Sequence, residues 1–222
     1  MKRTLIKICG LTRTEDVLAC QYAGVDAVGF VFYPESKRAI TPDKAATLCR
    51  YLGPWQMPVA LFVNPSATMV KKVLQSIPNA LLQFHGDEST EFCESFKRPY
   101  IKAIRMADGV DLFQQCQVFA SAQGLLLDSW SVGFGGSGHA FNWSVLPNLN
   151  QLSLPCILSG GLNLQNIQAA MTQLKPYGVD LSSGVEVQPG HKSANLITSF
   201  CAAVREIDTH TMALSNHNLR HN

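Results

Sequence analysis

The chain carries little charge. Lys, Arg, Asp and Glu make up 15% of its 222 residues, and the formal net charge is only +2. Proteins that bind nucleic acid or an anionic membrane surface present an excess of basic residues. We therefore expect no nucleic-acid partner and no membrane partner. The 46% of apolar residues is typical of a packed globular protein and not of a disordered chain.

Long apolar runs and paired cysteines are lacking as well. No apolar stretch reaches the roughly 18 residues that a membrane span requires, and the segment before the first predicted strand is not of the signal type, so we expect no leader. The seven cysteines are scattered, without CxxC pairs or histidines at zinc spacing. We therefore expect free thiols in a reducing, cytoplasmic setting and no bound metal.

Short β-branched runs alternate with longer amphipathic stretches along the chain. The predicted strands are Leu5–Cys9, Ala27–Phe32, Val59–Asn64, Leu81–His85, Tyr100–Arg105, Leu125–Ser129, Cys156–Ser159 and Val179–Ser183. The predicted helices are Glu15–Tyr22, Pro42–Leu52, Ala67–Ser76, Glu88–Phe96, Val110–Ala120, Trp143–Leu149, Leu164–Leu174 and Ala194–Ile207. Thr41 before Pro42 is a helix-start signal.

Eight such units in so few residues favour a closed sheet. An open doubly wound sheet would also alternate strands and helices, but no glycine-rich dinucleotide turn follows the first strand. The pattern therefore predicts a single-domain (β/α)8 TIM barrel over residues 1–208. Residues 209–222 are rich in His and Asn and lack an apolar period, so we expect a disordered C-terminal tail.

Polar residues gather at the predicted carboxyl ends of the strands, where barrels of this type carry their active sites. They are Cys9, Ser36-Lys37-Arg38, Asn64, His85, Arg105, Asp128, Ser159-Gly160-Gly161 and Ser182-Ser183-Gly184.

Small residues close the last two strands. Gly160 and Gly161 follow the seventh strand, and Ser182, Ser183 and Gly184 follow the eighth. Glycine allows backbone N–H groups to approach an anion closely, and barrels commonly hold phosphate at these two loops. The alternative is that the glycines only turn the chain. Two such loops on adjacent strands favour a phosphate site.

Cys9 ends the first predicted strand, where Lys7 shares its face. We expect both to point into the barrel, and a buried Lys7 needs a partner, for which Asp180 on the neighbouring eighth strand is suited. Most buried cysteines are inert. Positive potential beside a phosphate site would raise the thiolate fraction of Cys9 and make it a base.

Asp128 ends the sixth predicted strand after three leucines, and Arg38 lies in the second loop. Asp128 is either a cap or a catalytic carboxyl; across the mouth from Cys9 it would complete a base–acid pair for proton transfer at carbon. Arg38 is either an exposed loop cation or a guanidinium that holds a substrate carboxylate.

The motifs at these strand ends resemble those of the phosphoribosylanthranilate isomerase family over about residues 4–207. They are Lys7-Ile8-Cys9-Gly10-Leu11-Thr12, Ser36-Lys37-Arg38, Gln83-Phe84-His85-Gly86-Asp87-Glu88, Leu127-Asp128-Ser129, Gly135-Gly136-Ser137-Gly138, Phe141-Asn142-Trp143, Leu158-Ser159-Gly160-Gly161-Leu162, Val179-Asp180-Leu181-Ser182-Ser183-Gly184-Val185-Glu186 and Pro189-Gly190.

The resemblance implies an isomerase of tryptophan biosynthesis that converts N-(5-phosphoribosyl)anthranilate to 1-(2-carboxyphenylamino)-1-deoxyribulose 5-phosphate. This Amadori rearrangement is an aldose–ketose type isomerisation that needs no cofactor. It implies Cys9 as general base, Asp128 as general acid and Arg38 as the ligand of the anthranilate carboxylate. The phosphate would bind Gly160, Gly161, Ser182, Ser183 and Gly184, with His85 a further candidate for substrate contact. We expect a monomer whose only partner is this small molecule.

Three positions depart from the family pattern. Asn142 and Ser193 stand where the family commonly has Asp, and both can still cap a helix. Lys37 replaces the usual proline and is expected to loosen the second loop. We expect the glycine-rich segment 130–140 to close over the substrate.

Two other functions remain open. One is another phosphate-binding barrel enzyme of histidine or tryptophan metabolism, which Cys9 and Arg38 disfavour. The other is a non-catalytic barrel that binds a sugar phosphate, which the Cys9 and Asp128 pair disfavours.

Overall fold

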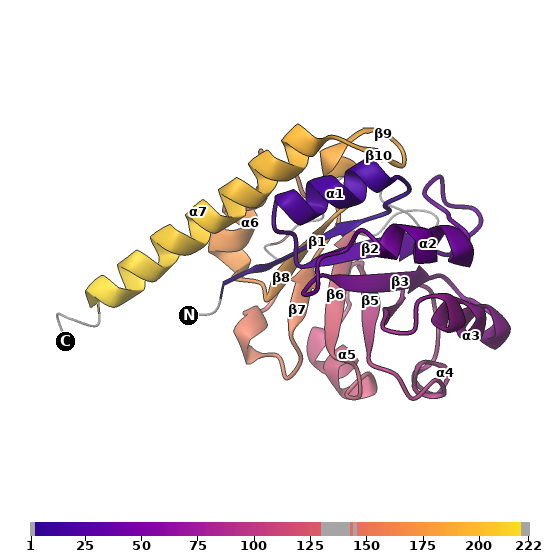
Figure 1. The fold of residues 1–222 in the computed structure, drawn as a ribbon. Coiled ribbons are helices and arrows are strands. Elements are labelled where there is room, and N and C mark those ends of the chain that lie inside the picture. Colours follow the sequence, from indigo (N-terminus) through magenta and orange to yellow (C-terminus); the bar gives the residue numbers. More distant parts are fainter. Residues whose placement is uncertain (1–2, 130–142, 144–145, 219–222) are drawn as a thin grey trace.

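The computed structural model describes residues 3–129, 143 and 146–218. Eight parallel strands close into a barrel in sequence order, and β1 pairs with β8 (Figure 1). The strands are β1 (Leu5–Cys9), β2 (Ala27–Val31), β3 (Met57–Phe62), β4 (Leu81–Phe84), β5 (Tyr100–Met106), β6 (Gly124–Ser129), β7 (Cys156–Leu158) and β8 (Gly178–Leu181). The predicted (β/α)8 barrel is confirmed.

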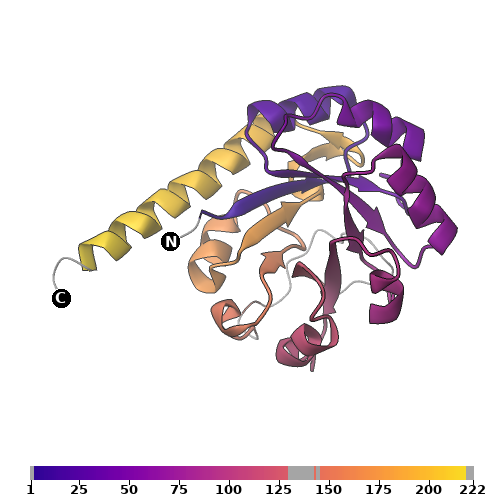
Figure 2. The same cartoon turned by 60° about the horizontal axis from the view of Figure 1, so that its bottom comes forward.

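Helices form a ring around the strands (Figure 2). They are α1 (Thr14–Tyr22), α2 (Pro42–Cys49), α3 (Ala67–Ser76), α4 (Thr90–Glu94), α5 (Leu112–Val118), α6 (Ile167–Leu174) and α7 (Ala194–Asn218). Short 3-10 turns lie at η2 (Leu149–Gln151) and η3 (Ser183–Val185), and a hairpin of β9 (Glu186–Gln188) and β10 (His191–Lys192) follows β8. Thr41 caps α2, since its hydroxyl accepts a hydrogen bond from the Lys44 N–H.

The faces of β1 are divided as the sequence predicts. Ile6 and Ile8 are buried in the main apolar core, whereas Lys7 reaches Asp180 on β8. The two residues are paired in the strand register, their side chains are 6% and 5% exposed, and Lys7 Nζ lies 2.8 Å from Asp180 Oδ2. Closure of the barrel therefore supplies the partner that a buried ammonium requires.

The predicted helix at Trp143–Leu149 is not found as an α-helix in the part that is described, where Trp143 has 3-10 geometry. Residues 144–145 lie outside it, residues 146–148 are not helical, and η2 follows. Pro147 accounts for this, because proline has no N–H and clashes with the preceding turn of a helix. The glycine-rich segment 130–140 and Asn142 also lie outside the described residues.

The expectation of a disordered tail is not met over residues 209–218, where α7 continues to Asn218 and extends past the barrel (Figures 1 and 2). No glycine or proline follows Gly190 in the chain, so the two residues that most strongly end a helix are missing from it. The helix is also tied to the start of β1, because Thr4 donates its N–H and its hydroxyl to Asp208. Lack of an apolar period did not prevent a helix that was already nucleated.

The described residues contain no helix with the length and apolar character needed to cross a membrane. Nor do their His, Cys, Asp and Glu side chains form a group of three that could hold a metal ion.

Candidate active site

A pocket opens at the carboxyl ends of the strands, and it gathers most of the residues singled out from the sequence. Its lining includes Cys9, Ser36, Arg38, His85, Asp128, Ser159, Gly160, Gly161, Ser182 and Ser183, together with Asp180. Two other predicted rim residues, Asn64 and Arg105, contact Asp87 in the loop after β4 instead. The barrel thus brings residues of β1, β6 and β8 and of the loops after β2, β4, β7 and β8 to one cavity.

Cys9 lies at the end of β1 and is 5% exposed. Gly29 on β2 gives it room, since a Cβ there would lie 2.6 Å from the thiol sulfur. Burial raises the pKa of Cys9, although the ammonium groups of Lys7 and Lys192 oppose the shift. The expectation of an enlarged thiolate fraction is therefore wrong for the protein without ligand, because burial outweighs the two cations.

Asp128 lies at the end of β6 and is held on both oxygens. Its Oδ1 accepts the Ser129 N–H at 2.9 Å, and its Oδ2 lies 2.9 Å from His85 Nε2. The other ring nitrogen of His85, Nδ1, lies 3.0 Å from the amide nitrogen of Gln83. Because an amide nitrogen can only donate, Nδ1 accepts, and Nε2 carries the proton that His85 donates to Asp128. His85 therefore lines the pocket and also orients the predicted acid.

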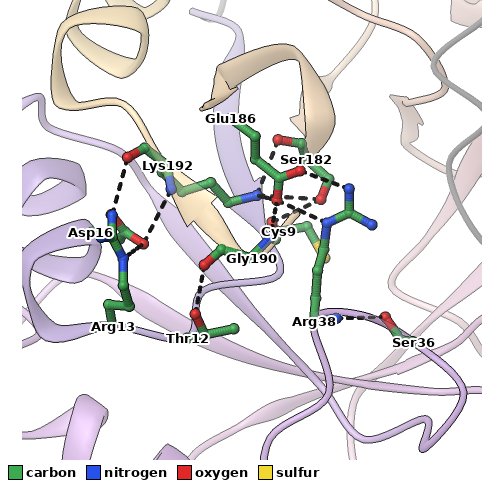
Figure 3. Close-up of polar contacts among 10 residues, drawn as sticks. All are labelled: Cys9, Thr12, Arg13, Asp16, Ser36, Arg38, Ser182, Glu186, Gly190 and Lys192. Carbon is green, nitrogen blue, oxygen red and sulfur yellow. Dashed lines mark hydrogen bonds and ion pairs between the residues drawn. The ribbon is translucent and has the colours of Figure 1, made fainter. Parts of the chain in front are cut away.

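Arg38 faces the pocket from the loop after β2, and its guanidinium is gripped from behind. Nε and Nη2 donate to the two carboxylate oxygens of Glu186 at 2.8 and 2.7 Å (Figure 3). Gly10, with φ +78, leaves space for the arginine stem, into which a Cβ would project. Ser36 accepts the Arg38 N–H at 3.1 Å, a hydrogen bond between the residues on either side of Lys37.

Glycines in the loops after β7 and β8 allow these loops to pack closely against neighbouring backbone groups. Gly160 and Gly161 have φ of +81 and +66, and a Cβ at Gly160 would collide with the Ser129 N–H. Gly184 lies in η3 and is not among the lining residues. A Cβ there would collide with the Leu162 carbonyl, so Gly184 acts by letting the two loops pack together.

Asp180 adds a group that the sequence analysis treated only as an ion-pair partner. It lines the pocket, and its Oδ1 is buried without a hydrogen bond to any described residue. Burial raises the pKa of Asp180, while Lys7 opposes this. A buried acceptor with no partner is costly, so Oδ1 is suited to a donor that arrives with a ligand.

Three further residues escaped the sequence analysis as site residues: Gln83, Glu186 and Lys192. A signal for the last two was present, because Pro189-Gly190 between two short extended segments is typical of a hairpin. Gln83 offered only the signal of an amide at an inward position of a strand. Ser193, which departs from the family pattern, still caps α7 by accepting the Leu196 N–H at 3.3 Å.

Comparison with known proteins gives one consistent result. The family model described as N-(5'phosphoribosyl)anthranilate (PRA) isomerase matches residues 6–203. The N-(5'-phosphoribosyl)anthranilate isomerase of Methylibium petroleiphilum is 48% identical over 211 residues, which are 95% of this chain and 98% of the relative.

Solved structures of such isomerases share the fold of this chain, as two of them show. The crystal structure of phosphoribosyl anthranilate isomerase from Thermotoga maritima is 36% identical with a TM-score of 0.83, covering 91% of this chain and 99% of that one. A structure of such an isomerase in complex with reduced 1-(o-carboxyphenylamino)-1-deoxyribulose 5-phosphate is 34% identical with a TM-score of 0.80, at the same coverage.

Proposed function

The chain belongs to the N-(5'-phosphoribosyl)anthranilate isomerase family, and on that premise we propose that it converts N-(5-phosphoribosyl)anthranilate to 1-(2-carboxyphenylamino)-1-deoxyribulose 5-phosphate in tryptophan biosynthesis. The observation that carries this proposal is that a thiol and a carboxyl, Cys9 and Asp128, line one pocket with a guanidinium, Arg38, and two glycine-containing loops. These are a base, an acid and sites for two anions, which is what this substrate requires.

The two anions of the substrate are assigned by charge and shape. Arg38 binds the anthranilate carboxylate through the side of its guanidinium that Glu186 does not occupy. Gly160, Gly161, Ser182 and Ser183 bind the phosphate through their backbone N–H groups. Gly184 lets the loop after β8 pack against the loop after β7, because it has no Cβ to meet the Leu162 carbonyl. A relative that holds a carboxyphenylamino sugar phosphate supports a ligand of this form.

Protons pass from Asp128 to the substrate and from the substrate to Cys9. Asp128 protonates the furanose ring oxygen, the C1–O bond breaks, and the lone pair of the anilino nitrogen forms a C1 iminium. This electron sink makes the C2 proton acidic, and the Cys9 thiolate removes it to give an enolamine. The enolamine becomes the ketone when the Cys9 thiol gives its proton to C1 and the C2 hydroxyl gives its proton to the Asp128 carboxylate, so both groups return to their starting states. The iminium forms within the substrate, so no cofactor is required for these steps.

The orientation of Asp128 is maintained by His85, and Asp180 accepts a hydrogen bond from a sugar hydroxyl through its buried Oδ1. The first assignment rests on the 2.9 Å contact and the second on the acceptor that lacks a described partner. His85 thus acts through Asp128, and it also lines the pocket.

The test follows the loss of phosphoribosylanthranilate fluorescence, with the substrate generated in situ, for the parent, Cys9→Ala and Asp128→Asn. We expect decay with the parent and none above background with either variant. If the parent leaves the substrate untouched but turns over another phosphosugar of histidine or tryptophan metabolism, the function is wrong. If it binds ribose 5-phosphate without turning over any of these, a non-catalytic barrel replaces our proposal.

Location and assembly complete the proposal: a monomer in the cytoplasm, with residues 1–208 as the catalytic domain. All seven cysteines are free thiols, which agrees with a reducing compartment. Cell fractionation tests the cytoplasmic location, and sedimentation velocity tests the monomeric state. A dimer would contradict the monomer, and Trp55, which is 94% exposed, is then the first side chain to replace.

A further inference from the structure

The β9–β10 hairpin carries a buried ion pair beside the pocket. Glu186 on β9 and Lys192 on β10 are paired in the hairpin register, and Lys192 Nζ lies 2.8 Å from Glu186 Oε1 (Figure 3). The side chains are 5% and 0% exposed. Neither lines the pocket. A buried charge pair needs further partners to offset its desolvation, and these partners lie at both ends of the site.

One set of partners is at the carboxylate end. Glu186 accepts from Arg38 Nε and Nη2, and its Oε1 also accepts the Gly190 N–H at 3.1 Å. This bidentate contact leaves Arg38 Nη1 without a hydrogen bond to any described residue. Burial disfavours the charged form of Glu186, but Arg38 and Lys192 together lower its pKa, so the carboxylate stays ionised at neutral pH.

The other set is at the phosphate end. Lys192 Nζ donates to the carbonyl oxygen of Ser182 at 3.0 Å and to its hydroxyl at 3.3 Å. That hydroxyl donates in turn to the Cys9 carbonyl at 3.1 Å. A chain of hydrogen bonds therefore runs from Lys192 through the loop after β8 to the end of β1.

The hairpin itself is fixed to the barrel. Asp16 on α1 accepts the Lys192 N–H at 3.2 Å, and Arg13 donates both to Asp16 and to the Lys192 carbonyl. Thr12 donates to the Gly190 carbonyl at 2.5 Å. The backbone of Lys192 is thus fixed to the barrel, and its ammonium is fixed to Glu186 and Ser182. Lys192 can therefore hold these two residues in place.

From these contacts we propose that Glu186 and Lys192 are positioning residues which hold Arg38 and the Ser182 loop in one network, so that the substrate carboxylate and the substrate phosphate are bound at a set separation. This inference rests on the proposed function. With Arg38 the network contains two cations and one carboxylate. One positive charge is left uncompensated, and the substrate carboxylate balances it.

The test compares Glu186→Gln, Lys192→Met and their double variant with Val187→Ala, a control on the same hairpin whose residue is 70% exposed. Steady-state kinetics give KM and kcat, and calorimetry gives the Kd of ribose 5-phosphate and of anthranilate. Ribose 5-phosphate reports the phosphate end and anthranilate the carboxylate end. Neither binding measurement requires turnover.

We expect Glu186→Gln to raise KM about tenfold or more with kcat within about threefold, because the guanidinium loses its fixed orientation while the acid and the base are untouched. Its Kd for anthranilate rises and its Kd for ribose 5-phosphate changes little. Lys192→Met raises both Kd values, since its ammonium contacts the Ser182 loop directly and Glu186 as well.

The double variant guards against misfolding, because it removes the Lys192 ammonium that Glu186→Gln alone leaves buried without its carboxylate. If the folded variants match Val187→Ala in KM and in both Kd values, the proposal is overturned. A loss confined to kcat, with both Kd values unchanged, overturns it too. A parent that binds both fragments but has no turnover refutes the proposed function, and the Kd values then still decide whether the network positions the two subsites.

Discussion

His85 donates its Nε2 proton to Oδ2 of Asp128 at 2.9 Å, across the gap between β4 and β6. Gln83 determines which ring nitrogen of His85 carries the proton. Its amide nitrogen lies 3.0 Å from Nδ1 and donates to it, so the proton is on Nε2. The carboxyl group proposed as the acid therefore has a defined orientation before any substrate binds. That relationship could not be read from the sequence, which offered His85 only as a possible substrate contact.

We predict that His85→Leu lowers kcat by about two orders of magnitude and changes KM little, because Asp128 loses the donor that orients it. His85→Gln keeps a donor and should lose less. Steady-state fluorescence assays measure both constants. The reverse pattern, with KM raised and kcat kept, would show that His85 binds substrate and does not act through Asp128.

The reactivity of Cys9 should depend on pH. Burial raises the pKa of this thiol in the folded protein, so at neutral pH most of it is protonated and the reactive thiolate increases as pH rises. We predict that the rate of Cys9 alkylation by iodoacetamide rises with pH, close to tenfold per pH unit, between about pH 6 and about pH 8. Mass spectrometry of the Cys9 peptide measures it. A flat profile would contradict a buried, protonated thiol.

The Lys7 and Asp180 pair should be costly to break. Lys7→Met leaves the Asp180 carboxylate buried without its cation, and we predict a loss of about 3–5 kcal/mol in the free energy of unfolding. Lys7→Met combined with Asp180→Asn should recover part of the loss, because no unpaired charge remains. Urea denaturation followed by circular dichroism measures both. A single variant as stable as the parent would mean that the pair is not needed for closure of the barrel.

A chain that ends at Asp208 should keep its activity and most of its stability. It removes the distal part of α7 but retains the two hydrogen bonds from Thr4 to Asp208. In the full-length chain, Asp208→Ala breaks both of them and should lower the free energy of unfolding by about 1–3 kcal/mol. Thermal denaturation and the fluorescence assay test these statements. Loss of activity on truncation would assign residues 209–222 a role in the catalytic domain.

Much of the fold was determined by local pattern. Each predicted strand overlaps the observed one, because strands buried on both faces must be apolar throughout. The inward direction of Lys7 followed from the alternation of side chains along β1, and its partner followed from closure. The two clear errors had local causes as well. Pro147 interrupts a predicted helix, and the stretch after Thr209 contains no glycine or proline.

The position of the pocket could also be predicted from the sequence, since polar residues at the carboxyl ends of parallel strands meet at one rim of a barrel. What tertiary structure alone decided was the electrostatic state of that rim. Whether burial or nearby ammonium groups control the Cys9 thiol depends on distances between β1, β8 and the hairpin. Which face of Arg38 remains available depends on Glu186, which is 148 residues away. Charge interactions act through space and vary with burial, so the order of residues along the chain does not contain them until the barrel has closed.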